Sequence, residues 1–99
     1  MFITVFTFEA RPGNEEAVIN LFKEWQRDLM PVSRGVLASE VLRDAKNPRH
    51  FVSIARFESE AALRAVAGSS AQDAWYRKLV ALSLDEPVFT DYELAWSTQ

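Results

Sequence analysis

The stretch Phe2-Ile3-Thr4-Val5-Phe6-Thr7-Phe8-Glu9 decides the fold class. Its residues are almost all β-branched or aromatic, which favours an extended strand. Alternate side chains of a strand point to opposite faces of its sheet. One face would carry Phe2, Thr4, Phe6 and Phe8, and the other Ile3, Val5 and Thr7. Both faces are apolar, so we expect both to be covered.

The residues after this strand predict an amphipathic helix. Pro12-Gly13 breaks the strand, Asn14 is placed as an N-cap, and two glutamates follow in the first turn, where they favour the helix dipole. The apolar residues Val18, Leu21, Phe22, Trp25 and Leu29 recur at helical spacing. Met30-Pro31 predicts that the helix ends near residue 30.

The remaining segments extend the pattern to βαββαβ. Further strands are predicted at Val36–Arg43, Phe51–Phe57 and Val88–Trp96. Between the last two, a short helix should begin near Ser59, stop at Gly68 and be followed by a second helix that begins near Ser70. We therefore predict an α+β fold, ferredoxin-like, with an antiparallel four-stranded sheet and helices on one face.

The two-faced strands also predict a partner. In the third strand, Phe51, Ala55 and Phe57 oppose Val52 and Ile54 across the sheet plane. Helices on one face leave the other uncovered, and a second copy of the sheet would bury its apolar side chains. We expect a homodimer through sheet faces, with at least twice the 11.3 kDa mass of the chain.

Composition narrows the class of protein. The 99 residues predict a single domain, residues 1–99, and 48% hydrophobic content is ample for a core. Mixed charges with a net charge of −3 argue against nucleic acid as a partner. The chain has no cysteine, and we see no targeting or membrane segment, so we expect a cytoplasmic protein.

Four segments together resemble a known family. They are Glu9-Ala10-Arg11-Pro12-Gly13-Asn14-Glu15-Glu16, Arg34-Gly35-Val36-Leu37, Phe57-Glu58-Ser59-Glu60-Ala61-Ala62-Leu63 and Ser69–Trp75. In this order and spacing the chain resembles the antibiotic biosynthesis monooxygenase (ABM) family of dimeric α+β barrels. The resemblance implies ferredoxin-like subunits that pack sheet against sheet, and oxidation of phenolic or quinol substrates with oxygen and no metal or flavin.

The chain departs from the family's pattern in one region. Many members carry histidines in and just after the helix that follows the third strand, where this chain has Val66, Ala71 and Gln72. The haem-degrading branch is a poor fit, because it uses an Asn in the first strand and a His in the second helical region. Both are absent here.

Trp75 and Tyr76 are candidate catalytic residues, because the resemblance places them where the second helix borders a pocket. An indole or a phenol there could stack on an aromatic substrate and orient it. The helical spacing of Trp75 fits ordinary core packing better, and the same reasoning favours a core position for Trp25.

Arg56 and Tyr92 complete the candidate catalytic set. Arg56 interrupts an apolar strand, so its cation could hold a substrate oxyanion, or instead pair with Glu93 or Asp91 at the sheet edge or dimer interface. The Tyr92 phenol could donate to a substrate carbonyl, or could anchor the dimer together with Trp96.

Cofactor and metal sites are not predicted. His50, the only histidine, begins the third strand beside a polar connection, where a surface position is the better interpretation than a catalytic base. One histidine and scattered carboxylates have no metal-ligand spacing, and the three glycines form no phosphate loop.

Two hypotheses for function remain open. The first is a cofactor-independent monooxygenase acting on a small aromatic, phenolic or quinol substrate in a pocket between sheet and helices, with no cofactor. The second is a non-catalytic small-ligand-binding or structural dimer of the same fold, which the missing histidines favour. An effector-binding module shares the βαββαβ plan but normally accompanies a DNA-binding domain, and none is predicted.

Overall fold

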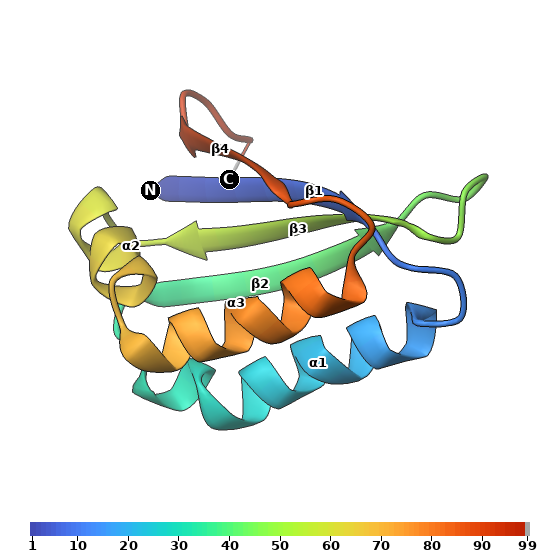
Figure 1. Cartoon of the computed structure of the whole chain (residues 1–99). Helices are drawn as coiled ribbons and strands as arrows, with labels where there is room; N and C mark the ends of the chain where they lie inside the picture. Colours follow the sequence, from blue (N-terminus) through green and yellow to red (C-terminus); the bar gives the residue numbers. More distant parts are fainter. Residues whose placement is uncertain (99) are drawn as a thin grey trace.

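The computed structural model describes residues 1–98, and its elements follow the predicted order (Figure 1). They are β1 (Phe2–Glu9), α1 (Glu15–Asp28), the 3-10 turn η1 (Met30–Val32), β2 (Val36–Arg43), β3 (His50–Phe57), α2 (Glu60–Ala67), α3 (Ser70–Leu82) and β4 (Val88–Glu93). The last strand ends at Glu93, so the prediction that it continues to Trp96 is wrong.

The four strands form one antiparallel sheet in the order β2-β3-β1-β4. The helices α1, α2 and α3 lie on the same side of this sheet, as Figure 1 shows. Strands β1 and β3 are therefore the central pair, and β4 and β2 are the edges. The ferredoxin-like α+β prediction is confirmed.

The helix-covered face of the sheet, which we call the inner face, carries the core. Along β1 its residues Phe6 and Phe8 are buried, and along β3 Phe51 and Phe57 are buried. The rings of Phe8 and Phe51 stack with centroids 5.5 Å apart. From α1 and α3, Val18 and Leu79 complete this core, along with other residues of the same cluster.

The opposite, outer face has no helix over it within residues 1–98. Strand register places Val5 beside Ile54, Thr7 beside Val52, and Ile3 beside Arg56. On the other side of β1, Ile3 is also beside Tyr92. This face is therefore largely apolar and lies open in the single chain.

Serine residues cap the N-termini of α2 and α3. The hydroxyl of Ser59 accepts a hydrogen bond from the Ala62 amide, and that of Ser69 accepts one from the Gln72 amide, both at 3.1 Å. Each bond satisfies an amide that the first helical turn leaves free. The second helix begins at Ser70, as predicted, and Ser69 is its N-cap.

Gly35 is required where the chain enters β2. Its φ is +81°, and a Cβ built on it would lie 2.6 Å from the Cβ of Ala62 in α2. A larger residue would therefore strain the backbone and push α2 away from the sheet. Gly35 thus permits close contact between α2 and the start of β2.

The helices of the described chain are all too short or too polar to cross a lipid bilayer.

Candidate functional site

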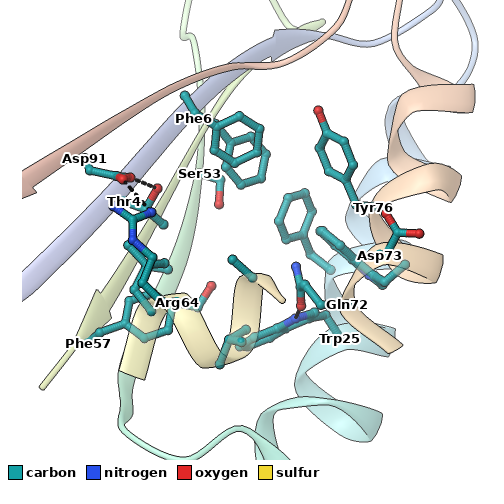
Figure 2. Close-up of a pocket in the computed structure, with 18 residues that line it drawn as sticks. Thr4, Phe6, Trp25, Ser53, Phe57, Arg64, Gln72, Asp73, Tyr76 and Asp91 are labelled. Atoms are coloured by element: carbon teal, nitrogen blue, oxygen red, sulfur yellow. Dashed lines mark hydrogen bonds and ion pairs between the residues drawn. The ribbon is translucent and has the colours of Figure 1, made fainter. Parts of the chain in front are cut away.

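A cavity of about 400 Å³ lies between the inner face of the sheet and the helices (Figure 2). This volume is within the usual range for a small-molecule site. Its lining comes from all four strands and all three α-helices. We call it the central cavity.

Small residues on the central strands create the space. Along the inner face, Thr4, Ser53 and Ala55 lie between the large rings of Phe6 and Phe57. Interiors normally pack to the density of organic crystals, so three adjacent small side chains leave a void unless helix side chains fill it. Here the side chains of the helices do not fill the space, and the void remains.

Seven aromatic residues line the central cavity. They are Phe6, Phe22, Trp25, Phe57, Trp75, Tyr76 and Phe89. The Trp75 indole is 5% exposed, and its Nε1 donates to the Leu21 carbonyl at 2.8 Å. An indole has only this one donor, so Trp75 presents an apolar surface to the cavity.

Trp25 and Gln72 join α1 to α3 at the cavity wall. The Trp25 indole Nε1 donates to Gln72 Oε1 at 2.7 Å. In Figure 2 the Gln72 amide nitrogen points away from Trp25, toward the open space. This nitrogen makes no hydrogen bond within residues 1–98.

Ser53 presents a second polar group near the centre of the sheet. The residue is 2% exposed, and its hydroxyl makes no hydrogen bond within the part of the chain that the structure describes. Figure 2 shows this oxygen turned into the cavity. Within the described residues no fully buried side-chain oxygen or nitrogen lacks a partner, so the Ser53 hydroxyl is accessible from the cavity, where it can bond to a ligand or water.

Charged side chains at one end of the cavity are paired with one another. Asp91 accepts a hydrogen bond from Thr4 Oγ1 at 2.8 Å and lies 3.5 Å from Arg64 Nη1 (Figure 2). Arg64 also lies 3.1 Å from Glu60. The single arginine that lines the cavity is therefore matched by two carboxylates.

Tyr76 and Asp73 line the cavity from α3. The Tyr76 ring packs against Phe89 with centroids 5.6 Å apart. Burial raises the pKa of the Tyr76 phenol, with a smaller contribution from the negative charge of Glu86. The phenol is therefore neutral near pH 7 and can act as a hydrogen-bond donor. The Asp73 carboxylate is 3.0 Å from Arg77 Nε.

The structure divides the predicted site residues between the two faces of the sheet. Trp75 and Tyr76 line the central cavity, and Trp25 both belongs to the core and lines the cavity. Arg56 and Tyr92 lie on the outer face, because each is beside Ile3 in the sheet. They cannot reach a ligand in the cavity through the sheet.

His50 also lies apart from the cavity, at the hairpin end of β3. No three metal-ligating side chains come together anywhere in residues 1–98.

Sequence reasoning did not select seven polar residues that line the cavity: Thr4, Ser39, Ser53, Arg64, Gln72, Asp73 and Asp91. The sequence did distinguish Ser53, because it is the polar residue among the inner-face residues Phe51, Ser53, Ala55 and Phe57 of β3. For Gln72 the signal was its position, where the resemblance leads one to expect histidine. Nothing local distinguishes Arg64 or Asp91 from other surface charges.

Comparison with known proteins places this fold in a family. Structural neighbours include SnoaB, a cofactor-independent oxygenase from Streptomyces nogalater solved as a mutant, with a TM-score of 0.87, 16% identity, and coverage of 98% of this chain and 95% of that one. An antibiotic biosynthesis monooxygenase superposes with a TM-score of 0.82 and 19% identity over 97% of this chain and 100% of the other.

Rv0793 from Mycobacterium tuberculosis has a TM-score of 0.83 at 16% identity, with 99% of this chain and 98% of that one covered. At these identities the neighbours establish the fold only. A search of curated proteins finds no match to the chain. The sequence pattern described as "Antibiotic biosynthesis monooxygenase" matches residues 1–78. Since this match covers most of the chain, the protein belongs to the antibiotic biosynthesis monooxygenase family.

Proposed function

We propose that the protein is a cofactor-independent monooxygenase that acts on a small phenol or quinol bound in the central cavity. The observation that carries this proposal is the cavity of about 400 Å³, walled by aromatic rings, in a member of this family. The likeness to SnoaB, a cofactor-independent oxygenase, supports it.

The reaction requires an electron-rich substrate that reacts with oxygen directly. The anion of the phenol supplies all four electrons that reduce O₂. One oxygen atom becomes a ring carbonyl in place of a C–H, and the other leaves as water, so a phenol and O₂ give a quinone and water.

The protein's part would be to bind, orient and desolvate the substrate. Flat apolar walls such as those from Trp75 and Phe57 suit stacking against an aromatic ring. Tyr76 is available as a neutral donor to a substrate oxygen.

Homodimerisation through the outer faces is part of this proposal. The outer face carries Ile3, Val5, Val52 and Ile54 without a covering helix. Burying several hundred Å² of such surface at about 25 cal/mol per Å² would stabilise a chain of this size appreciably. Arg56 makes no ion pair within residues 1–98, so a partner copy could supply one.

A second candidate, a non-catalytic ligand-binding dimer, is favoured by one observation. The two carboxylates that line the cavity, Asp73 and Asp91, are both paired with arginines, and no histidine lines it within the described chain. The site therefore offers no unpaired carboxylate or imidazole as a general base.

Oxygen consumption separates the two candidates. We would measure O₂ uptake by the wild type with a panel of quinols and polycyclic phenols, beside Trp75→Ala, Tyr76→Phe and the exposed control Lys23→Ala. Monooxygenase activity predicts uptake that both cavity variants reduce and the control retains. A ligand-induced thermal shift without uptake would favour the binding function, and neither uptake nor shift would contradict both.

A further inference from the structure

We propose that the Gln72 amide and the Ser53 hydroxyl act together as positioning residues that bind one oxygen atom of an uncharged aromatic ligand. The identity of that oxygen as a reacting phenol rests on the proposed function. The binding itself does not, because it follows from how these two groups are held in the central cavity.

The hydrogen bond from Trp25 determines which end of the Gln72 amide faces the cavity. An indole N–H is a donor and never an acceptor, so the oxygen of the amide must face Trp25. The NH₂ group then has to point the other way, into the open space (Figure 2). Trp25 is 7% exposed and packed in the core, so it holds the amide in this orientation.

Ser53 supplies a complementary group from the opposite wall. It belongs to β3, whereas Gln72 belongs to α3, and both polar atoms point into the same cavity (Figure 2). A hydroxyl can donate or accept, while the Gln72 NH₂ can only donate. Together they match a ligand hydroxyl, which accepts from Gln72 and donates to Ser53, or a carbonyl, which accepts from both.

The charges around the cavity argue against an anionic ligand. Arg64, the only cation in the lining that the structure describes, is engaged by Asp91 and Glu60. Asp73 adds a further carboxylate to the lining, and this one is paired with Arg77 outside the lining. A carboxylate or phosphate would meet negative charge without a free cation, whereas a neutral phenol or quinone avoids that repulsion.

The pair also has a chemical use. Two donors held toward one oxygen stabilise negative charge that develops there, and in a site walled by apolar rings such bonds are stronger than in water. The lining offers no free cation to a phenolate, so hydrogen bonds from Gln72 and Ser53 would offset part of the cost of forming the anion that reacts with oxygen.

The test compares two probes of nearly the same shape, 1-naphthol and 1-methylnaphthalene, by equilibrium dialysis at pH 7. The wild type should bind 1-naphthol more tightly. Gln72→Leu and Ser53→Ala should each weaken 1-naphthol binding about 3- to 10-fold, the value of one lost neutral hydrogen bond, and leave 1-methylnaphthalene nearly unchanged. Trp25→Phe should act in the same direction by freeing the Gln72 amide. Gln26→Leu, the same substitution at an exposed position of α1, is the matched control.

Equal affinity for the two probes in the wild type would overturn the inference. So would an unchanged preference in both Gln72→Leu and Ser53→Ala, or failure of the wild type to bind either probe. A preference for 1-naphthol that depends on Gln72 and Ser53, in a protein that consumes no oxygen, would refute the monooxygenase function and leave the oxygen-binding pair standing.

Discussion

The two faces of β1 have similar hydropathy but different surroundings. The inner face presents Thr4, Phe6 and Phe8, all buried under helices, and the outer face presents Ile3 and Val5, which no helix covers in the described chain. The inner face mixes large rings with small side chains, whereas the outer residues are β-branched and of similar size. Side-chain size therefore separates them: the inner face encloses a cavity, and the outer face forms an even surface suited to a second sheet.

The first prediction concerns a substitution that disrupts the proposed dimer interface on the outer face. Val5→Lys places an ammonium group at the centre of the proposed interface, beside Ile54 and Thr90 and without an acidic cross-strand neighbour. A charge buried without a partner costs about 3–5 kcal/mol, so we expect the dimer to dissociate about 150- to 5000-fold more readily. Size-exclusion chromatography with light scattering should report the monomer mass of 11.3 kDa in place of twice that value.

The control for this variant is Ala81→Lys, which adds the same charge to the exposed side of α3 and should leave the mass unchanged. Circular dichroism establishes that both variants remain folded. A wild type that is already monomeric at micromolar concentration, or a folded Val5→Lys dimer, would disprove the interface.

The second prediction concerns a substitution that fills part of the central cavity on the inner face. Ala55→Leu puts a larger side chain where Ala55 borders the central cavity. We expect at least about a 10-fold loss of 1-naphthol affinity, because the added atoms occupy the ligand's space. Stability should be unchanged or raised by about 1 kcal/mol, since filling a void improves packing. Equilibrium dialysis and urea denaturation measure the two quantities.

Ala61→Leu, on the exposed surface of α2, is the matched substitution and should alter neither quantity appreciably. Retained 1-naphthol binding together with a large loss of stability in Ala55→Leu would show that the site is ordinary core. In that case the inner face would differ from the outer one only in being covered.

These two faces also explain how far sequence reasoning reached. The period of two in β1 and β3 correctly grouped Arg56 with Val52 and Ile54, and the helical spacing located α1. That period cannot say which face of a two-sided apolar strand meets the helices. Arg56 and Tyr92 were therefore plausible pocket residues until three-dimensional packing placed them on the outer face.

The hydrogen bond between Trp25 and Gln72 could not be predicted from the local sequence, for a different reason. The two residues lie 47 positions apart and meet only because α1 packs beside α3. Helical spacing correctly indicated that Trp25 is buried, but burial alone does not identify a hydrogen-bond partner. Only the assembled helix pair shows that this core residue also orients a polar group in the cavity.

The last prediction, which has the smallest expected effect, concerns Tyr76 in the wall of the central cavity, where burial raises the pKa of its phenol. Folding favours the neutral phenol, so the folded chain holds this proton more tightly than the unfolded chain, whose tyrosine titrates near 10. The free energy of unfolding should therefore fall as the pH rises above about 10 and through the folded pKa. Tyr76→Phe should make this decline shallower when urea denaturation is compared between pH 9 and pH 11. Glu86→Gln should act in the same direction but less, because the charge of Glu86 is the smaller cause. An identical decline in the wild type and Tyr76→Phe would mean that the phenol is as well hydrated as one on the outer face, and would remove it from the cavity wall.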